Sequence, residues 1–307
     1  MNGPEKYLIV VVGPTAIGKT AKAIELAQHF QCEIISCDSR QFFKEMTIGT
    51  AVPSETELAA ATHHFIHNKS IFDQYTVGDF EKEAIFKLEE LFKSGDFAVM
   101  VGGSGLYVDA VLKGFDEFPE IETSVRENIA KQYEANGIAY LQNELKRLDP
   151  DYFAVADTEN PQRLMRALEV SIGSGKPYSS FLSGKENKRS FTPILIGLDA
   201  DREIIYDRIN RRVDLMIDEG LLAEAKTLYP HKDLNALQTV GYRELFQYFE
   251  GKISLEFAIS EIKKNTRRFA KRQLTWFRRN EKVKWFDYLT PVAEIEEYIQ
   301  MIVRGAR

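Results

Sequence analysis

The sequence contains little cysteine, no long hydrophobic run and no excess of positive charge. Its 307 residues include two cysteines, Cys32 and Cys37, whose number and spacing do not suit a zinc site, so we expect reduced, buried thiols. The apolar run from Tyr7 to Val12 is too short for a secretory signal or a membrane span. We therefore expect a cytoplasmic protein with no membrane partner. The net charge of −6 means that any nucleic-acid surface has to be a local patch.

Residues 13–20 have the spacing of a phosphate-binding loop, Gly-x-x-x-x-Gly-Lys-Thr, between the first apolar run and a helical pattern. The glycines let backbone N–H groups point into one concavity, Lys19 adds a positive charge, and the Thr20 hydroxyl can hold Mg²⁺. The loop therefore predicts a diphosphate site, although nothing in it selects a base, a sugar or a hydrocarbon. The predicted diphosphate ligands are Gly13, Pro14, Thr15, Ala16, Ile17, Gly18, Lys19 and Thr20.

Asp38 ends a second apolar run, which starts at Glu33. Ligands of an open α/β sheet lie at the carboxyl ends of its strands, so Asp38 should face the same crevice as the phosphate-binding loop. There it would serve as a Mg²⁺ ligand or as a general base. The structural alternative is that it only caps a helix or turn. The polar run Ser39-Arg40-Gln41 suits a contact surface better than a core.

A third apolar run, from Phe97 to Val101, leads into Gly102 and Ser104. A nucleotide hydrolase usually has an acid at this position, whereas this strand ends in glycines and a hydroxyl. Together the apolar runs and helical patterns predict an α/β fold, a P-loop NTPase-like parallel sheet core with helices on both faces. We also expect helices at 55–61 and 80–93.

The histidines at 63, 64 and 67 lie among turn and loop signals. His63 and His67 have the i, i+4 spacing of a zinc-binding helix. They lack the intervening catalytic glutamate and a clear helical pattern, so the sequence favours no metal site there.

Helical patterns between about Asp116 and Ser190 are broken by prolines and glycines, and no convincing strand is present. This region predicts an all-helical insertion between sheet elements. In its most informative helix, Asn160 can cap the start and Pro161 fits the first turn.

One face of that helix should point inward with Leu164, Leu168 and Ile172. Gln162, Arg163 and Arg166 project from another face. That ridge is either an ordinary solvated surface or a site for phosphate and base contacts.

After a return strand at 191–198, we expect one long helix from Asp201 to Leu228. Arg208 and Arg212 lie one turn apart on it and either clamp a diphosphate or belong to an ordinary surface. The stretch from residue 262 to 285 then holds ten basic residues, four aromatic residues and one acid. It is either a nucleic-acid surface or a helix that its aromatic side chains anchor to the core.

Seven segments of the chain resemble the motifs of bacterial tRNA dimethylallyltransferases in order and spacing, over nearly the whole length. They are Gly-Pro-Thr-Ala-Ile-Gly-Lys-Thr (13–20), Asp-Ser-Arg-Gln (38–41), Ile-Gly-Thr-Ala (48–51), Gly-Gly-Ser-Gly-Leu-Tyr (102–107), Gln-Arg-Leu-Met-Arg-Ala-Leu-Glu-Val (162–170), Val-Gly-Tyr-Arg-Glu-Leu (240–245) and Thr-Arg-Arg-Phe-Ala-Lys-Arg-Gln-Leu-Thr-Trp-Phe (266–277).

The resemblance implies transfer of the dimethylallyl group from dimethylallyl diphosphate to N6 of the adenosine immediately 3′ of the anticodon. The implied acceptors are tRNAs that read codons beginning with U, the implied cofactor is Mg²⁺ held by Thr20, and we expect a monomer. Asp38 would accept the N6 proton, Ser104 would hydrogen-bond near the reacting centre, and Arg212 would stabilise charge on the diphosphate. Ser104 stands where the family usually has threonine, and serine keeps the hydroxyl.

The family's tRNA contacts match thirteen positions. They are Asp38, Ser39, Arg40, Gln41, Ser104, Arg126, Gln162, Arg163, Leu164, Met165, Arg166, Lys271 and Arg272. The expected organisation is a P-loop core in residues 1–116, a helical insertion in 117–194 that contacts the tRNA anticodon stem-loop, and the rest of the core with a basic helical region in 195–307. Two other functions stay open, a P-loop kinase of small metabolites and a non-catalytic RNA-binding protein.

Overall fold

The structure is a computed structural model that describes residues 5–116, 118–182 and 188–305. The chain divides into two compact units, one within Met1–Lys113 and Lys188–Arg307 and the other within Gly114–Asn187. Residue 117, where we expected the insertion to begin, lies outside the described residues. None of the described helices combines the length and the apolar composition of a membrane span.

The first unit is built on a six-stranded sheet in the order β3-β2-β4-β1-β5-β6, and every pair of neighbouring strands is parallel. Because the strands are parallel, their carboxyl ends meet at one edge, where the ligands of such sheets bind. The strands are β1 (Tyr7–Val12), β2 (Ile34–Ser36), β3 (His63–His64), β4 (Phe97–Val101), β5 (Thr192–Asp199) and β6 (Lys284–Asp287).

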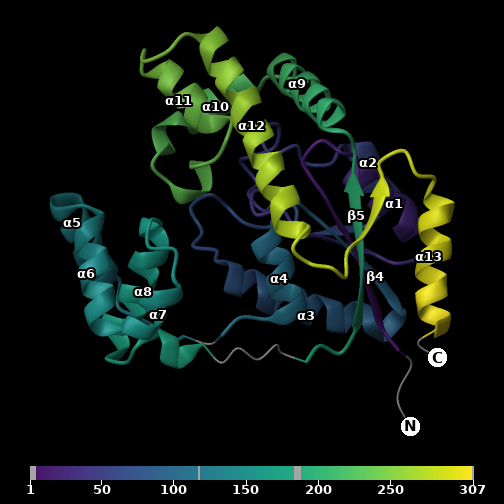
Figure 1. The fold of residues 1–307 in the computed structure, drawn as a ribbon. Helices are drawn as coiled ribbons and strands as arrows, with labels where there is room; N and C mark the ends of the chain where they lie inside the picture. The colour runs from purple at the N-terminus through teal and green to yellow at the C-terminus, as the bar shows by residue number, and fades with distance from the viewer. Residues whose placement is uncertain (1–4, 117, 183–187, 306–307) are drawn as a thin grey trace. The chain divides into compact units, whose positions relative to one another are not determined.

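The central strand β1 is buried on both sides, which explains why its sequence is apolar without alternation. Tyr7, Ile9 and Val11 pack with α1 (Lys19–His29) and α13 (Val292–Gly305), which lie side by side on one face of the sheet in Figure 1. The residues between them pack with α3 (Val77–Ser94) and α4 (Gly105–Lys113) on the other face. The expected parallel sheet with helices on both faces is confirmed.

A further group of helices in the first unit surrounds its own apolar cluster, which includes Val213, Leu221 and Tyr242. The single helix expected from 201 to 228 is wrong, because the structure has two helices there. Gly220 lies between them with a φ of 104°, which is not a helical conformation. The helices are α9 (Arg202–Asp218), α10 (Leu221–Leu228), α11 (Tyr242–Phe249) and α12 (Leu255–Phe277), with short helices η2 (Tyr229–His231) and η3 (Asn235–Leu237) between α10 and α11.

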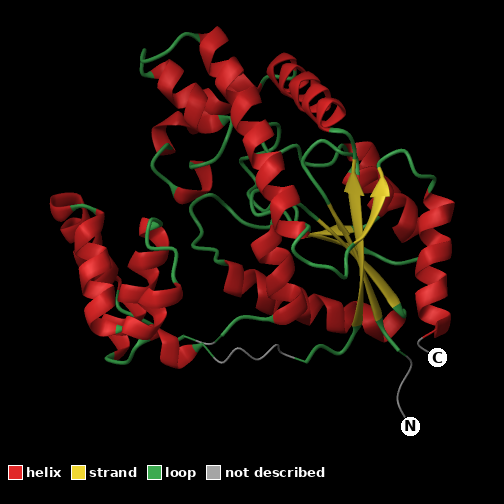
Figure 2. Ribbon diagram, viewed as in Figure 1, coloured by secondary structure: helices red, strands yellow, loops and turns green. Residues whose placement is uncertain are grey.

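The second unit contains helices and loops but no strand among its described residues, as Figure 2 shows. Leu164 and Leu168 are buried in its core as expected, but Ile172 is exposed, so its expected inward position is wrong. Ser171 takes the buried place instead, where its hydroxyl accepts a hydrogen bond from Tyr178 N. The helices are α5 (Thr123–Asn136), α6 (Ile138–Leu148), α7 (Pro150–Val155), α8 (Pro161–Ser174) and η1 (Tyr178–Phe181).

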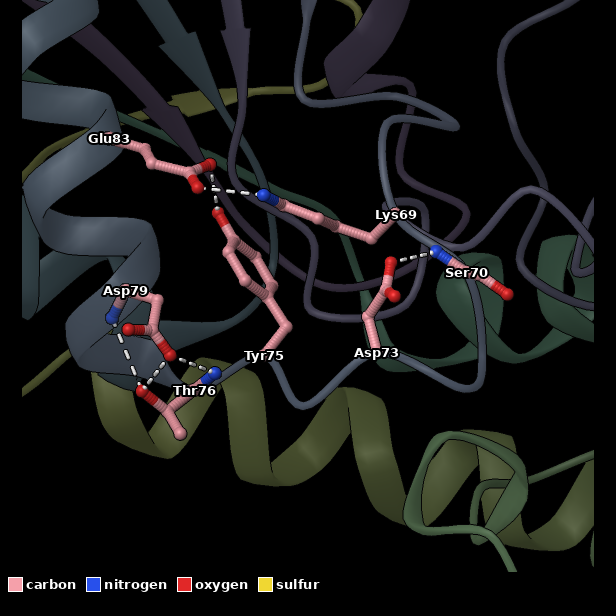
Figure 3. Close-up of polar contacts among 7 residues, drawn as sticks. All are labelled: Lys69, Ser70, Asp73, Tyr75, Thr76, Asp79 and Glu83. Atoms are coloured by element: carbon pink, nitrogen blue, oxygen red, sulfur yellow. Dashed lines mark hydrogen bonds and ion pairs between the residues drawn. The ribbon is translucent and has the colours of Figure 1, made fainter.

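The segment that follows β3 is tied to the start of α3 by the contacts in Figure 3. Thr76 and Asp79 form a capping box, in which each side chain accepts the other residue's backbone N–H, at 3.2 and 2.8 Å. Glu83, one turn further on, accepts hydrogen bonds from Lys69 Nζ at 2.7 Å and from the Tyr75 hydroxyl at 3.0 Å. The short helix α2 (Glu55–Ala60), just before β3, has its own capping box.

We predict that Thr76→Ala lowers the free energy of unfolding by about 1 kcal/mol, because the first turn of α3 loses its cap. Thr76→Ser is the matched control, since it keeps the hydroxyl. Denaturant titration of both variants checks the prediction, and an equal loss in both would assign the effect to the methyl group instead of the cap.

Candidate active site

The phosphate-binding loop joins β1 to α1 and depends on two glycines with positive φ. Gly13 has a φ of 149°, and a Cβ atom there would lie 2.5 Å from the backbone oxygen of Leu198 on the neighbouring strand. Gly18 has a φ of 105° and occupies the N-cap position of α1. A side chain at either position would therefore strain the loop.

The loop is held from outside by two side chains of the first unit. Gln273 accepts a hydrogen bond from Thr15 N at 2.8 Å and donates one to Gly103 O at 2.9 Å, so it links the loop to the end of β4. Arg208 Nε donates to Ala16 O at 2.8 Å. Sequence reasoning missed Gln273, although an uncharged amide in a basic stretch, with Ala270 three residues before it on the same helix face, was a usable signal.

Two cations of the site lie close to each other. Lys19 Nζ donates to Pro14 O at 2.8 Å, and burial together with the neighbouring Arg212 lowers the pKa of Lys19 to about 7. Burial also lowers the pKa of Arg212, while the charge of Asp38 opposes the shift. Both cations would be stabilised by an anionic ligand, which fits the expected diphosphate site.

Asp38 lies just beyond β2, at the same edge of the sheet. Its Oδ1 atom accepts a hydrogen bond from Arg40 N at 3.0 Å. Burial raises the pKa of Asp38, and the Arg40 N–H together with the charges of Lys19 and Arg212 opposes the shift. The carboxyl group is thus a poorer acid than an exposed aspartate and a better proton acceptor.

Ser104 is joined to the segment after Asp38 by direct hydrogen bonds. Its Oγ atom accepts from Ser39 N at 3.1 Å and lies 3.2 Å from Ser39 Oγ, to which it donates. The two strand ends approach so closely that a Cβ atom on Gly102 would lie 2.0 Å from Cys37 O. Gly102 therefore allows this close approach, which a side chain at the same position would prevent.

These residues line one pocket of about 650 Å³ in the first unit. Lys19, Thr20, Asp38, Ser104 and Arg212 form much of its polar wall. Apolar side chains line the pocket as well. The apolar side chains include Ile209, Val213, Leu215, Met216, Leu221 and Val240.

Among the loop residues, Thr15, Ala16, Gly18, Lys19 and Thr20 line this pocket, whereas Gly13, Pro14 and Ile17 are buried behind it. The pocket also brings in the other expected residues of the 38–41 segment. These are Ser39, Arg40 and Gln41.

The remaining expected tRNA contacts are not among the lining residues of this pocket. Lys271 and Arg272 are exposed on α12, and the Arg272 guanidinium lies over the Phe269 ring at 5.7 Å. Phe269 itself is 38% exposed and lines the pocket. The exposed face of α12 thus places basic and aromatic groups at the pocket rim.

In the second unit, Gln162, Arg163 and Arg166 are exposed on α8 as expected. Arg126 and Arg166 each pair with Glu169, at 3.0 and 3.2 Å. Two more of the expected contacts, Leu164 and Met165, are buried in the core of the unit. Their side chains pack inside the unit and are not presented to a ligand.

The pocket offers few side-chain donors for a metal ion. The described residues contain no group of three or more His, Cys, Asp or Glu side chains placed to hold a metal ion. His63 lines the pocket, and its Nδ1 lies 2.8 Å from Ala61 O. Mg²⁺ keeps most of its water and often takes one or two protein ligands together with substrate phosphates, so the Thr20 hydroxyl beside a diphosphate fits this ion.

Comparisons with known proteins agree with this geometry. The family model of IPP transferases matches residues 41–280. A tRNA dimethylallyltransferase of Flavobacterium johnsoniae is 70% identical over 300 residues, which cover 96% of this chain and 97% of that protein. The full-length tRNA isopentenylpyrophosphate transferase of Bacillus halodurans is 36% identical, with a TM-score of 0.73 and 98% of each chain covered.

A eukaryotic dimethylallyltransferase, whose crystal structures show it acting on tRNA, is 26% identical with a TM-score of 0.78. The match covers 93% of this chain and 75% of that one. The family expected from the motifs is confirmed, and the chain belongs to the IPP transferase family, together with the bacterial tRNA dimethylallyltransferases.

Proposed function

We propose that the protein transfers the dimethylallyl group of dimethylallyl diphosphate to N6 of the adenosine immediately 3′ of the anticodon in tRNA. The acceptors would be tRNAs that read codons beginning with U. The observation that carries the proposal is one pocket that combines a phosphate-binding loop, a half-buried carboxyl group and apolar side chains. A P-loop kinase of small metabolites would have no use for the basic, aromatic rim on α12.

The donor diphosphate would lie against the loop. Backbone N–H groups of the loop and the start of α1, with Lys19 and Arg212, would stabilise the charge that develops as the allylic C–O bond breaks. The apolar side chains that line the pocket, which include Val213 and Leu221, suit the short hydrocarbon chain of the donor. Mg²⁺, held by Thr20 and diphosphate oxygens, would add positive charge beside the leaving group.

The acceptor adenine would enter from the side of Asp38 and Ser104. The exocyclic amine is a poor nucleophile because its lone pair is delocalised into the ring. As the new N–C bond forms and diphosphate leaves, the N6 proton would pass to Asp38, whose pKa is raised by burial. Ser104 would hydrogen-bond close to the reacting atoms. The target base must leave its stack, which a single-stranded anticodon loop makes inexpensive.

The remaining tRNA contacts would come from both units. On α12, Lys271 and Arg272 are exposed beside the aromatic rim, and on α8 the ridge of Gln162, Arg163 and Arg166 is exposed. Arg126 approaches the same ridge through Glu169. We therefore assign the second unit to the anticodon stem-loop. We also propose that the protein is a monomer.

We predict that Asp38→Asn lowers the rate of prenyl transfer by about 10²- to 10⁴-fold while tRNA binding changes little. The asparagine keeps the acceptor for Arg40 N but cannot take the proton. The matched control is Asp199→Asn, at the end of β5, where the carboxylate pairs with Arg278 outside the pocket. Digestion of the product tRNA and identification of the nucleoside measures transfer, and a fully active Asp38→Asn enzyme would exclude the base role.

The pH dependence of transfer should report the same group. Because burial raises the pKa of Asp38, kcat/KM for tRNA should fall as the pH drops through a value above ~4, the ordinary pKa of aspartate. The carboxylate is the active form, so the loss lies on the acid side. Residual transfer by Asp38→Asn should not show this loss at low pH. If the variant loses activity at the same pH as the wild type, the titrating group is not Asp38.

Arg163→Ala and Lys271→Ala should each weaken tRNA binding and reduce the slope of log K against log salt by about 1, because each removes a phosphate contact. The KM for dimethylallyl diphosphate should stay the same. Lys93→Ala, an exposed lysine on α3, serves as the control. Filter binding of unmodified tRNA over a salt series measures the slopes. Equal slopes in all three variants would show that Arg163 and Lys271 do not contact the tRNA.

A further inference from the structure

Three consecutive backbone N–H groups in the first unit converge on one carboxylate. Thr47 N and Ile48 N donate to Glu224 Oε2 at 3.0 and 2.8 Å, and Gly49 N donates to Glu224 Oε1 at 2.9 Å. Converging N–H groups of this kind form a nest that binds anions. Here the anion is a side chain of the protein itself, carried by α10.

The same carboxylate is fixed from its other side. The hydroxyl of Tyr242, a buried residue at the start of α11, donates to Glu224 Oε1 at 2.6 Å. Gly49 lies against this hydroxyl, because a Cβ atom there would be 2.5 Å from it. The loop at 47–49 is thus clamped between Glu224 and Tyr242.

The clamped loop continues directly into the pocket. Thr50 O and Ala51 O both accept hydrogen bonds from Gln41 Nε2, at 3.2 and 2.9 Å. Gln41 Oε1 accepts one from Ser36 Oγ at 3.1 Å. The orientation of the Gln41 amide is therefore fixed, since its two donors meet carbonyls and its oxygen meets a hydroxyl.

Gln41 belongs to the wall that contains Asp38, on the acceptor side of the pocket. It lines the pocket together with Thr50 and Ala51, whereas Glu224 and Tyr242 do not line it. No hydrogen bond of Gln41 runs to the phosphate-binding loop. A change at Glu224 would thus reach the acceptor wall and leave the diphosphate cradle untouched.

We infer that Glu224 is a positioning residue, which holds the 47–51 loop and through it Gln41 in the geometry that receives the tRNA nucleotide. The inference rests on the proposed function for the nature of the acceptor. It predicts a selective effect, in which the use of tRNA depends on Glu224 and the use of the prenyl diphosphate does not.

The test compares Glu224→Gln with Tyr242→Phe in the full-length protein. Glutamine has nearly the same shape, but its NH₂ group would face backbone N–H groups, so the clamp opens without a cavity. Phenylalanine removes one contact of the same carboxylate and keeps all three from the loop. Neither residue belongs to the catalytic or binding machinery.

We expect Glu224→Gln to raise the KM for tRNA about tenfold, as the loss of hydrogen bonds to a charged group would. The KM for dimethylallyl diphosphate should stay unchanged. Tyr242→Phe, which keeps all three loop contacts of Glu224, should raise the KM for tRNA much less than Glu224→Gln does. In combination with Gln41→Ala, the effect of Glu224→Gln should be much less than additive, because both act through one path. Hydrogen exchange at the amides of Thr47, Ile48 and Gly49 should accelerate in Glu224→Gln.

Several results would overturn the inference. An unchanged KM for tRNA, equal changes in both KM values, or a larger defect in Tyr242→Phe than in Glu224→Gln would show that Glu224 only supports folding. Unchanged amide exchange would show that the clamp does not hold the loop. Wild-type protein that makes no dimethylallyladenosine would refute the proposed function instead, and the exchange experiment would still decide whether the clamp exists.

Discussion

The site depends on two half-buried cations, Lys19 and Arg212, and one half-buried carboxyl group, that of Asp38, which lie close together. Burial lowers the pKa of Lys19 and of Arg212 and raises that of Asp38, so each group is shifted toward its neutral form. The attraction between Asp38 and the two cations opposes all three shifts, whereas the charge of Arg212 adds to the shift of Lys19. A diphosphate in this place would favour the charged cations while leaving Asp38 able to take a proton. Binding and proton transfer would therefore use the same electrostatic arrangement.

The geometry of this arrangement comes from contacts between segments that are distant in sequence. Gln273 on α12 holds Thr15 of the phosphate-binding loop and Gly103 after β4 at the same time. Ser104 holds the segment after β2. One buried amide and one hydroxyl thus join three strand ends, and they need no metal to do so. Small displacements of α12 would be felt at both the loop and the β4 end.

Much of the fold and the site could be predicted from the sequence, because the informative features are local. The apolar run before Gly13, the loop spacing and Asp38 at a strand end are all visible in short windows. The break at Gly220 was missed, since glycine inside a helical pattern is often tolerated. Gln273 and Glu224 were missed for another reason. Their roles depend on loop partners 170 or more residues away in sequence, which no local pattern encodes.

The chain leaves the first unit at Lys113 and returns to it at Lys188, between α4 and β5. The pairing of β5 with β1, from Tyr7 and Thr192 to Val12 and Gly197, involves residues of the first unit on both strands. Relatives could therefore lengthen, shorten or replace the inserted helices during evolution while the catalytic edge of the sheet stayed intact. Chimeras that exchange this segment between homologues would exploit the same modularity.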